Sequence, residues 1–125
     1  MRVGIFDTMD CAHTLPGVDK GELHGHTYKV EVVVQGRFDG KMLLDFKTLR
    51  QSARQAMALF DHKNANEVLK FPSTENICLA LFQTLKKSQP GLVTLRLWEG
   101  NSKWSEVTAG DPSLMQDPGW LQAPR

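Results

Sequence analysis

Three of the four histidines in the sequence lie between residues 13 and 26: His13, His24 and His26. A single glycine separates His24 from His26, so both side chains project to the same face of an extended strand. If His13 lies on a neighbouring strand and points to that face, three neutral imidazoles can hold a tetrahedral Zn²⁺ and leave its fourth position open, as catalytic zinc sites do. The same spacing is also typical of polar strand residues and of hydrogen-bonded core histidines, so both interpretations stay open at this point.

The fourth histidine, His62, follows Asp61 just past the end of an expected helix. Loops at such positions commonly present side chains to a cleft. An aspartate beside a histidine can orient the imidazole ring and stabilise its charged form, as general acid or base catalysis requires. An Asp-His pair is equally typical of a solvated helix end, and the pair alone does not decide between the two roles.

Glu99 ends a segment, residues 92–99, in which apolar and polar residues alternate. It shares the parity of Leu95 and Leu97, so a strand here places the carboxylate at the end of an inward-facing apolar row. A buried carboxylate needs hydrogen-bond or charge partners. A ligand with adjacent N–H donors would supply them, and so would a lysine or arginine of the core.

The composition is that of one compact domain: 125 residues, 14.0 kDa, 41% hydrophobic and 23% charged. A chain of this length buries enough apolar surface to fold without a metal or disulfides, so we expect any bound metal to be functional. The formal net charge is +1, with no basic block and no acidic tail. This pattern argues against nucleic acid or a membrane as partner and favours a small molecule.

The two cysteines, Cys11 and Cys78, lack the paired spacings of a disulfide framework or a four-thiolate zinc site. The N-terminal segment reaches Asp7 before any apolar stretch of signal-peptide length, and no later run approaches membrane-spanning length. We therefore expect reduced thiols and a cytoplasmic location.

Four main strands are expected to position these residues. The alternation of residues 26–36 is the clearest, and residues 2–14, 92–99 and 104–108 complete the set. Asp39-Gly40 is a turn dipeptide, so residues 42–44 are expected to form a short return strand paired antiparallel to residues 26–36.

Two helices are expected between the strands. Asp45 is a suitable N-cap for a helix over residues 46–60, and Ser73 is one for a second helix that ends before Pro90-Gly91. The order predicts an α+β fold with helices on one face of an antiparallel sheet. We expect a single domain over residues 1–110, followed by a C-terminal tail, residues 111–125, that is loose or docked on a neighbouring subunit.

A series of separated motifs of the chain carries a family resemblance: CAHTLPG before LHGHTYKVEVVVQG, then KMLLDF, LFDHKNANEV, FPSTENI and LRLWEG. In order and spacing, residues 9–107 resemble the 6-pyruvoyltetrahydropterin synthase and 6-carboxytetrahydropterin synthase family. The resemblance implies the tunnelling fold, ββααββ, with a four-stranded antiparallel sheet and two helices on one face. It further implies that subunits assemble into a barrel, usually a homohexamer, with active sites between subunits.

The resemblance also implies a role for each functional residue. His13, His24 and His26 look like the three zinc ligands. Asp61 and His62 look like the pair that supports proton transfer. Glu99 looks like the carboxylate that grips the pterin ring N–H groups, and Ser73 and Thr74 match the stretch that lines the pterin pocket.

The chain departs from the family pattern at the usual base. The family's catalytic cysteine stands four residues before the HGH motif, where this chain has Lys20, and a related subgroup has a glutamate where this chain has Gly21. Three residues can compensate. Glu22 shares the face of His24 in an extended chain and ranks first, Lys20 occupies the slot itself, and Cys11 shares the parity of His13.

The resemblance therefore implies a zinc-dependent lyase that acts on the side chain of 7,8-dihydroneopterin triphosphate, similar to 6-carboxytetrahydropterin synthase on the route to deazapurines such as queuosine. Two alternatives stay open. One is retro-aldol cleavage of dihydroneopterin to 6-hydroxymethyldihydropterin on the folate-type route. The other is a catalytically silent homologue that binds zinc and pterin.

Overall fold

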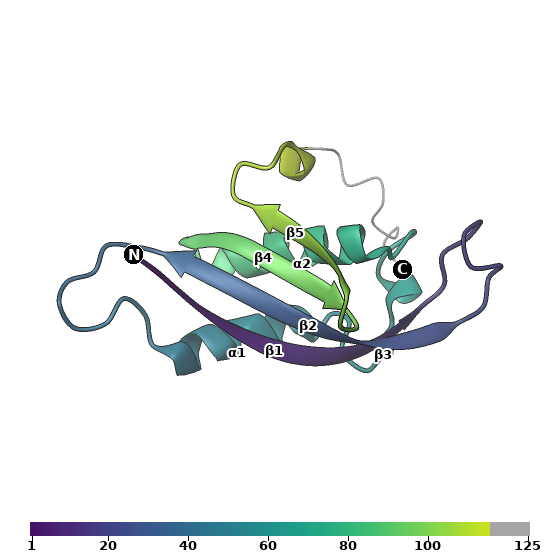
Figure 1. Cartoon of the computed structure of the whole chain (residues 1–125), viewed down its shortest axis with the longest axis horizontal. Coiled ribbons are helices and arrows are strands. Elements are labelled where there is room, and N and C mark those ends of the chain that lie inside the picture. The colour runs from purple at the N-terminus through teal and green to yellow at the C-terminus, as the bar shows by residue number, and fades with distance from the viewer. Residues whose placement is uncertain (116–125) are drawn as a thin grey trace.

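Five strands form one sheet in the order β3-β1-β2-β4-β5, seen in a computed structural model that describes residues 1–115 (Figure 1). The strands are β1 (Arg2–His13), β2 (His24–Gln35), β3 (Lys63–Asn64), β4 (Leu92–Glu99) and β5 (Lys103–Thr108). The helices are α1 (Phe46–Met57) and α2 (Thr74–Ser88), with short 3-10 turns η1 (Ala65–Glu67) and η2 (Pro112–Met115).

The two longest strands of the sheet, β1 and β2, form an antiparallel hairpin. Its register runs from Arg2 opposite Gln35 to His13 opposite His24, so the two strands pair over their whole length. Alternate residues of β2, from Tyr28 to Val34, are buried, as the period-2 pattern predicts. The three histidines therefore lie where the buried face of this hairpin ends.

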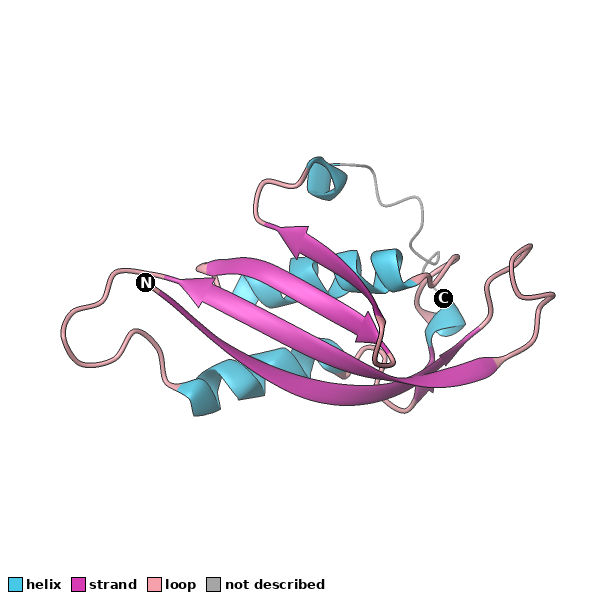
Figure 2. Cartoon of the chain, viewed as in Figure 1, coloured by secondary structure: helices cyan, strands magenta, loops and turns pink. Residues whose placement is uncertain are grey.

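Both helices cover the same face of the sheet (Figure 2). The Asp45 carboxylate accepts a hydrogen bond from the Lys47 N–H, and the Ser73 hydroxyl accepts one from the Asn76 N–H, so both predicted N-caps are confirmed. Helix α1 ends at Met57, three residues earlier than expected, but Phe60 is fully buried beyond it. The core fills the space between these helices and β2, β4 and β5.

The expected four-stranded antiparallel sheet is wrong in two respects. The sheet has a fifth strand, β3, and this strand pairs parallel to β1 through Cys11 with Lys63 and Ala12 with Asn64. It forms because the chain leaving α1 turns back onto β1, where the His62 N–H donates to the Asp10 carbonyl at 2.7 Å. A strand of two residues has no alternation by which a sequence pattern could indicate it.

The expected return strand at residues 42–44 is also absent from the described chain. Both edges of β2 are already occupied, by β1 on one side and β4 on the other. The Gly36 N–H donates to the Met1 carbonyl and the Gln35 N–H to the Gly91 carbonyl, which closes the end of the strand. Leu43 and Leu44 instead pack against the core from a loop.

The expected C-terminal tail is only partly described. Its first residues form η2, and Leu114 packs against the core. Residues 116–125 lie outside the described residues. Within residues 1–115, no helix has the length and apolar character needed to cross a membrane.

Candidate active site

His13, His24 and His26 converge at one end of the β1–β2 hairpin. One ring nitrogen from each lies within 4.8 Å of the others. His13 is buried, and the other two are half-buried. The Nε2 atoms of His13 and His24 are 3.1 Å apart, close to the separation of about 3.3 Å between two ligands of a tetrahedral zinc ion.

Hydrogen bonds on the far side of two rings determine their tautomers. Nδ1 of His13 lies 2.7 Å from the Pro72 carbonyl, and Nδ1 of His24 lies 3.0 Å from the Glu22 carbonyl. Because a carbonyl only accepts, each Nδ1 carries the proton and donates. The Nε2 atoms of the two rings face each other, an arrangement that a cation between them would stabilise.

The third ring also fits a metal. Nε2 of His26 is buried and has no hydrogen-bond partner among residues 1–115. Burial lowers the pKa of His26, the neighbouring His13 and His24 rings lower it further, and the Glu99 carboxylate opposes both effects. A neutral imidazole with an unpartnered buried nitrogen is the form that binds Zn²⁺.

Glu99, at the end of β4, lies beside this cluster. Its Oε2 accepts a hydrogen bond of 2.7 Å from the Thr74 hydroxyl, and its Oε1 lies 3.5 Å from Nε2 of His26 and 3.6 Å from Nζ of Lys103. Burial alone would raise the pKa of Glu99, but the Thr74 hydrogen bond and the nearby His26 and Lys103 hold it below the usual value. The carboxyl group is therefore ionised and able to accept N–H donors from a ligand.

Tyr28, which sequence reasoning did not single out, lies beneath two of the histidines. Its ring meets those of His13 and His26 edge-on, at centroid distances of 6.4 and 5.7 Å. The side chain is fully buried, and its hydroxyl has no hydrogen-bond partner within residues 1–115. Burial raises the pKa of Tyr28 well above its usual value. The ring therefore packs against the two histidines from the core side. Tyr28 shares the parity of His24 and His26 in β2, and this pattern could have indicated the contact.

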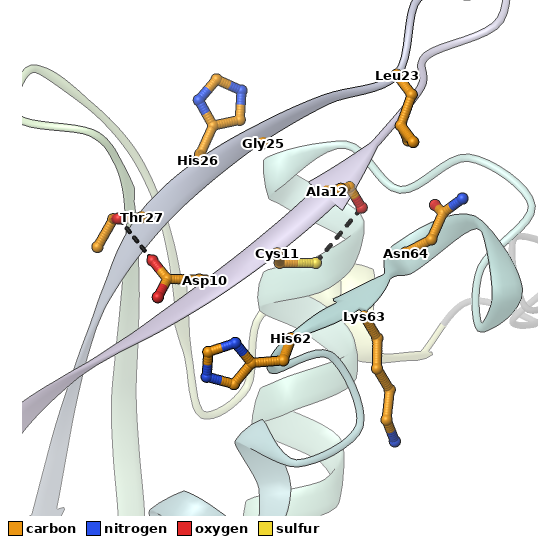
Figure 3. A pocket seen from close by; sticks show the side chains of 10 residues that line it. All are labelled: Asp10, Cys11, Ala12, Leu23, Gly25, His26, Thr27, His62, Lys63 and Asn64. Carbon is orange, nitrogen blue, oxygen red and sulfur yellow. Dashed lines mark hydrogen bonds between the residues drawn. The ribbon is translucent and has the colours of Figure 1, made fainter.

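Asp61 and His62 precede β3, on the opposite side of β1 from β2. His26 and His62 both line an open groove of about 580 Å³, with Cys11 on β1 between them (Figure 3). Cys11 pairs with His26 on β2 and with Lys63 on β3, so about two strand spacings, roughly 10 Å, separate the three-histidine cluster from β3. Within one chain the structure brings these groups to one groove but not into contact.

Two hydrogen bonds fix the turn that carries His62 to β1. The Asp61 carboxylate accepts a hydrogen bond of 3.0 Å from the Asp10 N–H, and the Asp10 carbonyl accepts one from the His62 N–H. His62 has a positive φ of 60°, a strained value for a residue with a Cβ. Its side chain is 77% exposed, and Nε2 lies 3.7 Å from Asp61 Oδ1, beyond hydrogen-bond distance.

The loop before β2 holds two of the three candidate replacement bases. Asp19 organises it by accepting from the Leu15 and Gly21 N–H groups. Lys20 adopts a positive φ of 59° and is exposed, as is Glu22. Glu22 lies next to the histidine cluster, because its backbone carbonyl accepts a hydrogen bond from Nδ1 of His24.

Cys11, the third candidate, is buried on the same sheet face as His13. Burial raises the pKa of the Cys11 thiol to about 11, because the charged thiolate is poorly solvated there. Its Sγ contacts the carbonyl of Ala12. A thiol in this environment stays protonated, which disfavours it as a base.

Comparison with known protein families identifies a match over most of the chain. The family model described as 6-pyruvoyl tetrahydropterin synthase matches residues 3–110. The chain belongs to the 6-pyruvoyl tetrahydropterin synthase family. The family resemblance noted from the motifs is thereby confirmed.

Two relatives within this family carry names of different activities. The chain is 37% identical over 109 residues to a protein of Archaeoglobus fulgidus named "Putative 6-carboxy-5,6,7,8-tetrahydropterin synthase", covering 86% of this chain and 95% of the relative. It is 38% identical over 97 residues to the dihydroneopterin monophosphate aldolase of Pyrococcus furiosus, covering 75% of this chain and 85% of the relative.

The fold is shared with a solved member of the family. The structure of Caenorhabditis elegans 6-pyruvoyl tetrahydropterin synthase superposes with a TM-score of 0.78 at 18% identity, covering 86% of this chain and 94% of that one. The relatives named as a synthase and as an aldolase both process pterins, so the family membership supports a pterin side-chain lyase as the class of activity.

Proposed function

We propose that this protein is a zinc-dependent lyase that acts on the side chain of 7,8-dihydroneopterin triphosphate, as a 6-carboxytetrahydropterin synthase does. The observation that carries the proposal is the position of Glu99, whose carboxylate lies 3.5 Å from an unpartnered nitrogen of the three-histidine cluster. A carboxylate that grips a flat heterocycle beside a metal site suits a substrate with a ring and an oxygen-rich side chain. The Archaeoglobus fulgidus relative favours this route, which leads toward deazapurines such as queuosine.

The substrate ring would be held by the start of α2 and the end of β4. Glu99 accepts hydrogen bonds from the ring N–H groups, while Thr74 holds the carboxylate in place and Ser73 lies at the start of the same helix. His13, His24 and His26 would hold the zinc ion. Bound zinc would supply a Lewis acid for the hydroxyl oxygens of the substrate side chain and for developing negative charge.

Two groups are proposed to move protons. Glu22 takes a proton from the substrate side chain, because its backbone carbonyl accepts a hydrogen bond from His24 and this contact holds the residue beside the histidine cluster. His62 donates and accepts protons at its imidazole, with Asp61 fixing the turn that presents it. Lys20 and Cys11 are the alternatives to Glu22.

The active site is proposed to form between subunits. Because β1 separates His62 from the histidine cluster in one chain, a substrate held at Glu99 would meet His62 of a neighbouring subunit more easily than its own. A homohexamer built as a barrel from such sheets provides this arrangement. Both cysteines are free thiols, and we place the enzyme in the cytoplasm, where thiols stay reduced.

A second candidate function rests on the other relative. The similarity to the Pyrococcus furiosus aldolase, together with a carboxylate rather than a cysteine as the proposed base, favours retro-aldol cleavage of a dihydroneopterin to 6-hydroxymethyldihydropterin. The third candidate is a catalytically silent homologue that binds zinc and pterin. The experiment must distinguish it from the two enzymes.

A product assay separates the three. Zinc-loaded protein is incubated with 7,8-dihydroneopterin triphosphate, with dihydroneopterin monophosphate and with dihydroneopterin, and products are identified by mass. Acetaldehyde with 6-carboxytetrahydropterin supports the proposed function, whereas a two-carbon aldehyde with 6-hydroxymethyldihydropterin supports the aldolase. Tight pterin binding without turnover supports the silent homologue. Loss of turnover in Glu22→Gln, with zinc content unchanged, supports Glu22 as the base.

A further inference from the structure

Lys103 lies directly across the β4–β5 turn from Glu99. The two residues are paired in the strand register, and Nζ of Lys103 lies 3.6 Å from Oε1 of Glu99. Both line a cavity of about 550 Å³ that Thr74 also borders. The lysine side chain is 70% exposed while the glutamate is 16% exposed, so the ammonium group lies at the mouth and the carboxylate lies inside. The proposed reaction uses Glu99 but gives Lys103 no role.

Glu99 and the groups around it present hydrogen-bond acceptors and donors in a fixed order to a ligand in this cavity. Oε2 is held by the Thr74 hydroxyl, and Oε1 faces His26 on one side and Lys103 on the other. Each carboxylate oxygen has further lone pairs for N–H donors. A ligand edge in this cavity therefore meets two acceptor oxygens followed by an ammonium donor.

A pterin ring has the complementary edge. Its 2-amino group and N3–H are adjacent donors, and the 4-oxo group beside them is an acceptor. Glu99 can satisfy the two donors only, which leaves the 4-oxo group in need of a donor when the ring is withdrawn from water.

We propose that Lys103 is a specificity-determining residue that donates a hydrogen bond from Nζ to the 4-oxo group of the bound pterin. This inference rests on the proposed function, because it takes the pterin to be bound at Glu99. A lysine has a flexible stem and three donors, so a short movement of the exposed ammonium group lets it contact both the carboxylate and the ring. A site that hydrogen-bonds a carbonyl in this way discriminates against a ring without a good acceptor at that position.

The test compares pterin with its 4-thioxo analogue, which keeps the 2-amino and N3–H donors and replaces only the acceptor. Dissociation constants are measured by calorimetry for zinc-loaded wild-type protein and for the K103M, K103R and K47M variants. Lys47 lies on α1 and is the charge-matched control. Wild-type protein and K47M are expected to prefer pterin over the thioxo analogue by about fivefold, a ratio that K103R largely keeps.

K103M is expected to bind pterin about tenfold more weakly and to show almost no preference between the two rings. If Lys103 only orients Glu99, K103M weakens both ligands equally and keeps the fivefold ratio, which overturns the inference while the proposed function stands. If wild-type protein does not bind pterin, the proposed function and the inference both fail. Unchanged thermal unfolding of K103M confirms that the exposed substitution leaves the fold intact.

Discussion

The Thr74 hydroxyl donates a hydrogen bond of 2.7 Å to Oε2 of Glu99, which joins the first residue of α2 to the last residue of β4. The bond aims the carboxylate and leaves Oε1 toward the histidine cluster. Because the donor is neutral and the acceptor is charged, the contact belongs to the stronger class of protein hydrogen bonds.

Replacing Thr74 with valine is therefore expected to weaken pterin binding by about tenfold, since Glu99 loses its orientation and one buried partner. Thr74→Ser, which keeps the hydroxyl, is the control and should bind pterin within about twofold of wild type. Calorimetric titration with pterin measures both. Equal affinity of the valine and serine variants would show that the hydrogen bond does not position Glu99 for the ligand.

Zinc content is expected to depend on His24 and not on His62. Removing one of three imidazole ligands should lower zinc affinity at least about 100-fold, so His24→Ala purified with limiting zinc should hold far less metal than wild type. His62→Ala is the matched control, because this histidine lies on the other side of β1. Elemental analysis of dialysed protein measures the metal. A full complement of zinc in His24→Ala would contradict the three-histidine site.

The role of His62 predicts a loss of turnover without a loss of stability. Its side chain is 77% exposed, so His62→Ala should change the free energy of unfolding by less than about 0.5 kcal/mol. If it moves protons, kcat should fall by about 100-fold or more.

Asp61 is expected to behave differently from His62. Its carboxylate accepts from the Asp10 N–H, so Asp61→Ala should cost about 1 kcal/mol of stability as well as turnover. Urea denaturation and steady-state kinetics on both variants distinguish the two roles. Wild-type kcat in His62→Ala would remove this residue from the mechanism.

Both thiols are expected to be inert in the folded protein. Burial raises the pKa of Cys11 to about 11 and that of Cys78 to about 12, so almost no thiolate is present at neutral pH. Iodoacetamide should modify neither residue within an hour at pH 7, and both should react in urea. Cys11→Ser should keep turnover within about threefold of wild type. Rapid alkylation of Cys11 in the native state would restore it as a candidate base.

Local patterns in the sequence predicted where several residues of the candidate site lie on their strands and helices. The period-2 alternation of β2 placed His24 and His26 on one face, and the parity of β4 placed Glu99 inside. The two N-caps followed from residue type, because a cap is an interaction between residues close in the chain.

Contacts between distant segments could not be predicted in the same way. The carbonyl of Pro72 fixes the tautomer of His13 across 59 residues, and the Asp10 N–H binds Asp61 across 51. Strand β3 depends on the same approach of the chain to β1 and leaves no periodic signal. The return strand expected at residues 42–44 fails for a similar reason, since a turn dipeptide does not reveal that β4 already occupies the edge of β2.

Asp7, in the middle of β1, predicts how the stability of the protein depends on pH. Its Oδ2 accepts from Nε of Arg54 at 2.8 Å and lies 3.1 Å from Nη1 of Arg50, so it fastens α1 to β1. Burial alone would raise the pKa of Asp7, but the Arg54, Thr8 N–H and Arg50 hydrogen bonds outweigh it and hold the pKa below 3.8. The stabilisation is therefore fully present above about pH 3.8 and is lost as the pH falls through the lower, folded-state pKa.

Asp7→Asn is expected to lower the free energy of unfolding by about 1 kcal/mol at pH 7, because the arginines lose their charged partner. The difference from wild type should shrink as the pH falls below about 3.8, where wild-type Asp7 also becomes neutral. Urea denaturation between pH 7 and about pH 3 measures this, with Glu67→Gln, an exposed carboxylate on η1, as the control. A difference that stays constant across this range would mean that Asp7 stabilises the protein by its shape and not by its charge.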